Sequence, residues 1–173
     1  MAIEIEIPEK DYRELINTLQ LLAPQQVYKA SSAAAKRAMI AARTAGSRKI
    51  RQIYTIKARD VNSRITVKGV EGGAEMKIKG PMEGVKKYRG VMRKQGVFAM
   101  IKKGNSTRIP RSFTMNDRFV MREGPARYPV KGIYGPAVPQ LFGNPDVVDA
   151  MESRGQEMFI TRLEHEIMRR MGG

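Results

Sequence analysis

The sequence has no cysteine and no tryptophan, and histidine occurs once. Without cysteine there are no disulfide bonds and no thiolate ligands for a metal, which fits a reducing compartment. The single histidine, His165, lies between Glu164 and Glu166, and a histidine-centred metal site needs further ligands at compatible geometry. We therefore expect no metal site and no cofactor, and we interpret His165 as a surface residue of a helix.

Catalytic signatures are also missing. No serine has a candidate general base other than His165, and the glycine pairs and series match no phosphate-binding fingerprint. Asp146, Asp149 and Glu152 recur at three-residue steps, but the positive N-terminal end of a helix dipole accounts for carboxylates there without acid–base chemistry. These absences predict a protein that is not an enzyme.

Long hydrophobic runs and aromatic residues are scarce. The apolar runs are far shorter than the roughly 18 residues that a membrane-spanning helix needs, and no signal peptide is recognisable. We expect a soluble protein, made in the cytoplasm, with no membrane partner. Aromatic residues form 6% of the chain and 12 residues are Met, so the core should consist of Ala, Ile, Val and Met. The length of 173 residues favours a single domain over residues 1–173.

Acidic residues are few, and the formal net charge is +15. Residues 29–68 hold eleven Lys or Arg against the single Asp60, and residues 86–111 hold nine with no acid. This density favours a polyanion or an acidic protein as partner over a merely solvated basic surface. The second segment supplies the candidate DNA-facing or partner-facing surface, which consists of Lys86, Lys87, Arg89, Arg93, Lys94, Lys102, Lys103, Arg108 and Arg111.

The first third of the chain predicts a strand-like arm and two helices. Residues 1–7 alternate Ile with Glu, a period of two that suits a strand or an arm pairing with a neighbour's sheet. A helix is predicted over residues 9–22 and a long, basic, Ala-rich helix over residues 25–54. Gly46 is a candidate point for a kink or break in the long helix. Its narrow seam of small residues allows close approach of another backbone, and it consists of Val27, Ala30, Ala34, Ala38, Ala41 and Ala45.

The middle of the chain predicts a hairpin followed by a loop. A short helical turn is expected over residues 57–62, and residues 64–68 and 74–79 alternate as strands around the turn at Gly72-Gly73. Residues 82–96 combine Gly with Lys and Arg and show little apolar periodicity, so we expect a mobile basic loop there.

Residues 97–142 alternate short apolar runs with Gly- and Pro-containing connectors, which predicts short antiparallel strands joined by turns. Arginines interleave with Phe113, Phe119 and Tyr128 in this segment, a composition that also suits a nucleic-acid platform. Strand alternation instead favours aromatic side chains on one face of the sheet, packed in the core, and arginines on the other. Binding to a nucleic acid would then be to its backbone and independent of sequence.

A final helix should begin at Asn144 as cap, with Pro145 in its first position and Asp146 in its first turn. Gly155 is a candidate interruption. Its apolar face is predicted to contain Val148, Met151, Met158, Leu163, Ile167 and Met171. The sequence as a whole predicts an α+β fold: N-terminal helices including the long basic one, a small antiparallel β-sheet with a long basic loop, and a C-terminal helix packed on the sheet.

The segment 97–142 also resembles a known family. Its distinctive residues are Arg108-Ile109-Pro110 followed by Phe113, then Arg127-Tyr128-Pro129, then Pro136 and Pro139. In this order, between an Ala-rich basic helix and a charged helix, they are similar to the minor tail protein Z family of tailed phages and prophages. The resemblance is most specific over residues 97–142, is only compositional over residues 25–70 and 144–171, and is absent from residues 1–24.

The resemblance implies a structural role in a virion and no chemistry. A family member completes the tail end that faces the head and takes part in head–tail joining, in the neck near the path of the DNA. The implied partners are copies of the same chain in a ring, six-fold by expectation for tail components, and the neighbouring tail terminator, tail tube or head completion proteins, with packaged double-stranded DNA close by. The location would be the virion, after assembly in the host cytoplasm. The alternative is a general nucleic-acid-binding protein, for which the charge alone suffices.

Overall fold

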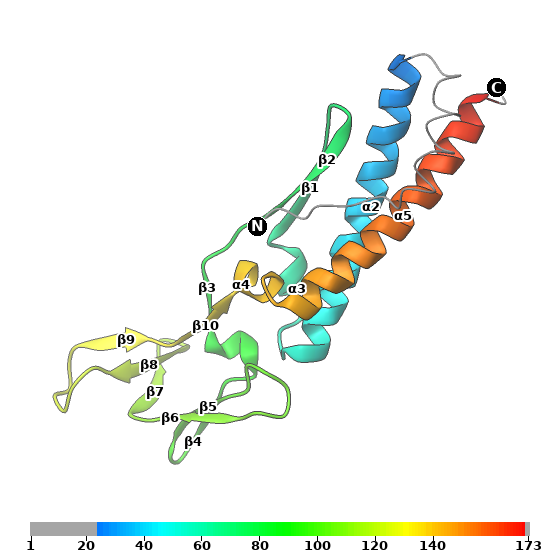
Figure 1. Ribbon diagram of the computed structural model, residues 1–173. Helices are drawn as coiled ribbons and strands as arrows, with labels where there is room; N and C mark the ends of the chain where they lie inside the picture. The colour runs from blue at the N-terminus through cyan, green and yellow to red at the C-terminus, as the bar shows by residue number, and fades with distance from the viewer. Residues whose placement is uncertain (1–23, 172–173) are drawn as a thin grey trace. The chain divides into compact units, whose positions relative to one another are not determined.

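The computed structural model describes residues 24–171, so the predicted arm at residues 1–7 and the helix at residues 9–22 lie outside the described residues. The predicted α+β class is confirmed: a long helix comes first, small antiparallel sheets follow, and a helix closes the chain (Figure 1). The chain divides into two compact units. The helical unit takes the residues up to Gly46 together with Ile65–Ile78 and the residues from Gly143 on. The strand unit takes Ser47–Arg64 and Lys79–Phe142.

The long helix α2 (Pro24–Ile53) is continuous through Gly46, so the predicted break there does not occur. Its buried residues follow one another at steps of four: Ala30, Ala34, Ala38, Ala42, Gly46 and Ile50. The predicted seam is therefore correct at Ala30, Ala34 and Ala38 and wrong at Val27, Ala41 and Ala45, which are only half-buried. Gly46 continues the seam of small side chains, which explains why a poor helix former occupies this position.

Helix α5 (Pro145–Met171) begins as predicted, with the Asn144 side-chain oxygen accepting a hydrogen bond from the Asp146 backbone N–H at 3.1 Å. It passes through Gly155 without interruption. Its buried residues are Val147, Met151, Gly155, Leu163 and Ile167, at steps of four except that the residue between Gly155 and Leu163, Phe159, is half-buried. The predicted face is therefore wrong at Val148 and Met158, both half-buried, and at Met171, which is exposed. His165 lies on the exposed side, as expected.

Within the helical unit, α2 and α5 run side by side (Figure 1). Ala30 and Ala34 of α2 form one apolar cluster with Leu163 and Ile167 of α5, and Phe159 packs against it. The small side chains of α2 thus accommodate the larger side chains of α5, as ridges of residues four apart do when helices pack. No helix in the described part of the chain is long and apolar enough to cross a membrane.

We predict that Ala38→Leu destabilises the protein by about 1–3 kcal/mol, because Ala38 is fully buried in this seam and extra methyl groups overpack it. Urea unfolding followed by circular dichroism measures the change. Ala35→Leu, at a half-buried position one residue after Ala34 of the seam, is the matched control and should cost less. Equal losses in the two variants would show that the seam does not pack more closely than its flanks.

The predicted hairpin is confirmed as β1 (Ile65–Val70) paired antiparallel with β2 (Gly73–Ile78). Gly72 has a positive φ of 73°, which a glycine adopts at little cost in a tight turn. The Ser32 hydroxyl of α2 lies 2.8 Å from the carbonyl oxygen of Val70 and 3.2 Å from that of Gly73, and it bonds the hairpin to the helix. The predicted helical turn that precedes the hairpin in the chain is also confirmed: it is α3 (Ala58–Asn62), which belongs to the strand unit.

The strand unit contains short antiparallel strands in separate small sheets, which confirms the prediction for residues 97–142. One sheet has the order β4-β5-β6 and another β7-β8-β9, while β10 pairs with β3. The strands of this segment are β5 (Gly96–Ala99), β6 (Thr107–Ile109), β7 (Ser112–Met115), β8 (Arg118–Arg122), β9 (Val130–Gly132) and β10 (Tyr134–Ala137). A short helix α4 (Val138–Phe142) follows, which the sequence pattern did not predict.

The prediction that residues 82–96 form a loop is wrong. This segment contains β3 (Met82–Gly84), a 3-10 helix at Val85–Tyr88 and β4 (Val91–Arg93). Val85 and Tyr88 are three residues apart, so one 3-10 turn buries both of them. Val85 forms an apolar cluster with Val97 and Ala99 of β5, and the segment is therefore part of the core of the strand unit.

Candidate functional site

The nine basic residues proposed as a partner-facing surface all lie in the strand unit, and eight of them are exposed. Lys87 alone is half-buried. Seven of the nine residues form two groups. Lys86, Lys87, Arg89 and Lys103 line a common pocket, whereas Arg93, Lys94 and Arg108 lie around the β4-β5-β6 sheet, where the Arg108 Nε donates to the Gln95 carbonyl at 2.8 Å. Lys102 and Arg111 are exposed and line neither of the pockets described below.

Two of these lysines are neutralised by acids that lie outside the basic segment. Lys86 Nζ lies 2.5 Å from an Asp117 carboxylate oxygen, and Lys87 Nζ lies 2.8 Å from Glu83 and 3.3 Å from Asp60. The charge repulsion in this region is therefore weaker than the lack of acids between residues 86 and 111 suggests. The folded chain brings compensating carboxylates to one end of the segment.

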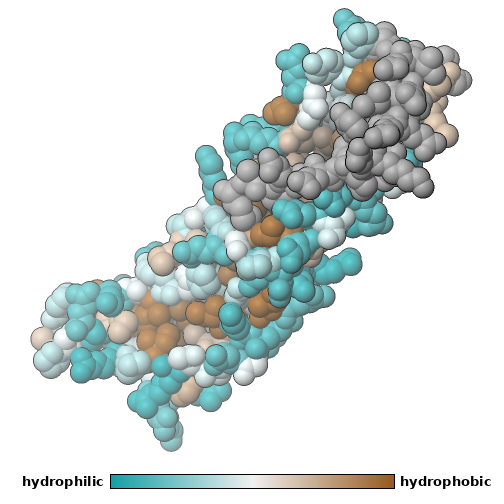
Figure 2. Space-filling model, viewed as in Figure 1, coloured by the Kyte–Doolittle hydropathy of each residue, from teal (hydrophilic) through white to brown (hydrophobic). Residues whose placement is uncertain are grey.

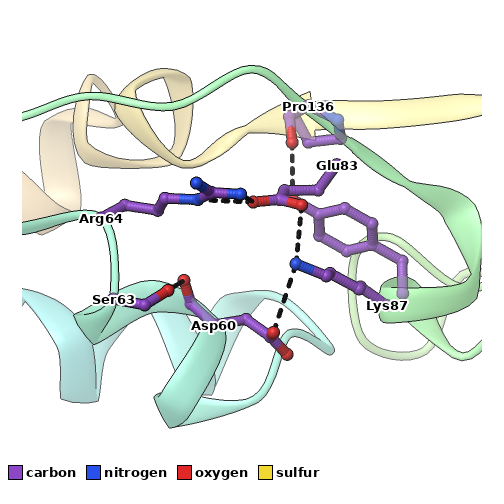
Figure 3. Close-up of polar contacts among 7 residues, drawn as sticks. Asp60, Ser63, Arg64, Glu83, Lys87 and Pro136 are labelled. Carbon is purple, nitrogen blue, oxygen red and sulfur yellow. Dashed lines mark hydrogen bonds and ion pairs between the residues drawn. The ribbon is translucent and has the colours of Figure 1, made fainter.

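Glu83 is the centre of a buried polar cluster, with 4% of its surface exposed (Figure 3). It lies on β3 among basic and apolar residues. Arg64 donates from Nε to Oε1 of Glu83 at 2.9 Å, and its Nη2 lies 2.8 Å from the same oxygen. Lys87 donates to the other oxygen, Oε2, at 2.8 Å, and it also reaches Asp60 of α3. This cluster joins α3, β3 and the 3-10 helix.

Burial and charge act in opposite directions on Glu83. Burial raises the pKa of its carboxyl group, but the hydrogen bonds and charges of Lys87 and Arg64 together outweigh burial and hold the pKa below its ordinary value. The pKa of Lys87 is raised, first by its hydrogen bond to Glu83 and then, against burial, by Asp60. Both groups are therefore charged at neutral pH. No sequence pattern predicts this cluster, because Arg64 and Glu83 are nineteen residues apart.

We predict that this cluster makes stability sensitive to acid. Because the folded-state pKa of Glu83 lies below the ordinary value of 4.5, its contribution is complete above about pH 4.5 and is lost as the pH falls through the lowered folded-state pKa. The difference in unfolding free energy between the wild type and Glu83→Gln should therefore narrow on acidification. Urea unfolding of both proteins at a series of pH values measures it. A difference that stays constant down to pH 3 would contradict the assigned charge.

Tyr88, the last residue of the 3-10 helix, bonds this helix to β10. Its ring is fully buried, and its hydroxyl donates to the carbonyl oxygen of Pro136 at 2.7 Å (Figure 3). Burial, and after it the charge of Glu83, raises the pKa of this hydroxyl, which stays protonated. Gly135 is required here, since an added Cβ would lie 2.7 Å from the Tyr88 ring. Pro136 of the family-like motif thus has a structural role through its backbone.

The other motif residues are spread over the strand unit. Ile109 packs against the cluster of Val85, Val97 and Ala99, whereas Arg108 and Pro110 are exposed. Pro139 is half-buried in α4. The Arg127 guanidinium lies 5.8 Å from the centre of the Tyr128 ring, which is 63% exposed, and Pro129 follows through a cis peptide bond.

The predicted division of aromatic residues and arginines between opposite sheet faces is wrong for part of this region. Phe113 pairs with Val120 in register, which places it on the face of β8 that also carries Arg122, and the Arg122 guanidinium lies 5.4 Å from the Phe113 ring centre. Phe119 does pack against the core cluster, as predicted, while Tyr128 is exposed. Of the three aromatic side chains, Phe113 is therefore contacted by an arginine, Phe119 packs in the core and Tyr128 is exposed, so they do not form one stacking platform.

A cleft of about 590 Å³ lies between the 3-10 helix, β8 and the β9–β10 connection. Its apolar floor is formed by Val85, Phe119 and Ile133, and its rim carries both acids and bases, including Asp60 and Arg118. Figure 2 shows hydrophilic residues over much of the visible face of this unit, with a hydrophobic area among them. A second pocket, of about 460 Å³, is lined by basic residues and contains no described carboxylate.

In the part of the chain that the structure describes, no three His, Asp or Glu side chains gather into a group that could hold a metal ion. Asp146 and Asp149 are exposed at the start of α5 and Glu152 is half-buried there.

Comparison with known proteins adds no further assignment: no family model, no curated protein and no solved structure matches this chain.

Proposed function

We propose that the protein is a structural component of the virion of a tailed phage or prophage. It completes the head-proximal end of the tail and takes part in head–tail joining, in the neck near the path of the DNA. It acts as a ring of identical subunits, six-fold by analogy with tail components, between the tail tube or tail terminator and the head completion proteins. The observation that carries the proposal is the resemblance of residues 97–142 to the minor tail protein Z family.

The charge of the strand unit supports this proposal. Seven of the nine residues in the basic surface, all except Lys86 and Lys87, form no ion pair with a carboxylate in the described residues. Exposed like charges repel one another in a free subunit, and a polyanion or an acidic neighbouring subunit offsets that repulsion. These seven exposed residues, Lys94, Lys102 and Lys103 among them, are therefore the proposed face toward DNA or an acidic neck protein.

Inactivation of the gene in an inducible phage or prophage tests the proposal. Heads filled with DNA and separate tails should accumulate, and a plasmid copy of the wild-type gene should restore joined particles, counted by electron microscopy. Normal particles without the gene product would contradict the virion role. The second candidate, a general nucleic-acid-binding protein, is supported by the same charge, and it predicts unchanged particle assembly with sequence-independent DNA binding that weakens steeply with salt.

A further inference from the structure

We infer that the basic pocket of the strand unit is a binding site for a phosphate group. The pocket has a volume of about 460 Å³, within the range of ligand-binding pockets in general. Its lining also includes Tyr54, Thr55 and Ile56, between α2 and α3. The cations that line it are Arg51, Lys57, Lys86, Lys87, Arg89 and Lys103. This inference does not depend on the virion role proposed above.

Acids inside the fold neutralise only part of this charge. Lys87 is held by Glu83 and Asp60, and Lys86 by Asp117. The other four cations, Arg51, Lys57, Arg89 and Lys103, form no ion pair with any carboxylate in the described residues. Four positive side chains therefore border one concave space without an anion from those residues, an arrangement that attracts a multiply charged anion.

The pocket is held in shape by the backbone. The Lys103 N–H donates to the Ile53 carbonyl at 2.9 Å, the Thr55 N–H donates to the Ile101 carbonyl at 3.1 Å, and the Thr55 hydroxyl bonds the Met100 carbonyl. Arg89 ends the 3-10 helix in the left-handed conformation, with a φ of 51° that a residue with a Cβ rarely adopts. Because the backbone that carries these cations is already fixed, binding an anion requires ordering of side chains but not of loops.

The C-terminus of α2 offers a different explanation for the cations, because Lys and Arg stabilise the carbonyl end of a helix. Backbone N–H groups satisfy two of the last four carbonyls of α2: the Tyr54 N–H donates to Ile50 at 2.7 Å and the Lys103 N–H donates to Ile53 at 2.9 Å. Lys57 and Arg89 lie outside α2 altogether. Capping therefore accounts for Arg51 at most, and the remaining cations favour an external anion.

Two triple variants with the same change in net charge test the inference. The pocket variant carries Arg51→Gln, Lys57→Gln and Lys103→Gln. The control carries Lys36→Gln, Arg37→Gln and Lys68→Gln, which also removes one Arg and two Lys, at exposed positions of the helical unit. Tripolyphosphate, a short duplex DNA and an acidic Glu-rich peptide are titrated into each protein by calorimetry, at low and at physiological salt. Circular dichroism confirms folding of both variants.

The pocket variant should bind a phosphate probe at least about tenfold more weakly than the wild type, and the control should lose less than about threefold, since distant charges are screened. Binding of tripolyphosphate assigns the site to small phosphate anions, and binding of the duplex alone assigns it to the nucleic-acid backbone. Equal losses in both variants, or binding of the acidic peptide only, would overturn the inference. In the wild type, amide chemical-shift changes should gather at residues 51–57, 86–89 and 103. Changes spread over the basic surface would also overturn it.

Discussion

Glu83→Ala should destabilise the protein by about 2–3 kcal/mol and lower its melting temperature by about 5–10 °C. The variant leaves Arg64 and Lys87 without their shared carboxylate, and breaking a buried ion pair by removing one partner costs about 3–5 kcal/mol. We expect less than the full amount, because the Arg64 and Lys87 side chains are 32% and 36% exposed and water solvates the released charges. Urea denaturation at neutral pH measures the change.

Glu75→Ala is the matched control for this prediction. Glu75 lies on β2 and is 46% exposed, and among the described residues its one ion pair is with Lys77 at 3.1 Å, so its removal should change stability by less than about 0.5 kcal/mol. A similarly small effect of Glu83→Ala would mean that the Glu83 cluster does not hold α3, β3 and the 3-10 helix together.

Reversing the charge of Lys94, Lys102 and Lys103 to Glu should reduce the number of joined head–tail particles about tenfold or more. Placing acids opposite DNA or an acidic neighbour costs several kcal/mol across an interface. The three lysines are exposed and take part in no ion pair in the described residues, so the subunit itself should stay folded. Particle yield is counted by electron microscopy after complementation of a strain that lacks the gene.

The control for the triple reversal is Lys29, Lys36 and Lys68 to Glu, an equal change of charge at exposed positions in the helical unit. It should assemble near the wild-type level. Normal yield from the first variant would remove Lys94, Lys102 and Lys103 from the functional surface, and equal loss from both would point to net charge alone.

Local signals made parts of the fold predictable from the sequence. The β1-β2 hairpin follows from strands that alternate around Gly72-Gly73, and the start of α5 follows from Asn144 and Pro145, whose effects act within a few residues. The register of the α2 seam was harder to predict, because alanine occupies both position 41 and position 42 and helical spacing allows either. At Ala30 and Ala34, packing against Leu163 and Ile167 of α5 fixes which face of α2 is buried.

The Glu83 cluster and the basic pocket were not predictable, since both depend on contacts between distant segments. Residues 82–96 carry few apolar side chains, yet Val85 and Tyr88 are enough to bury the 3-10 helix. With these two side chains buried, Glu83 accepts hydrogen bonds from Lys87 and from Arg64 of a different segment. The charge pattern identified the basic residues but could not show which of them are neutralised by Asp60, Glu83 and Asp117.

The most direct test of the virion role is to locate the protein on purified particles by immunogold electron microscopy with an antibody against the chain. The proposal predicts label at the head-proximal end of the tail, on complete particles and on separated tails. Label that is absent from particles while the protein remains in the soluble fraction, bound to nucleic acid, would contradict it.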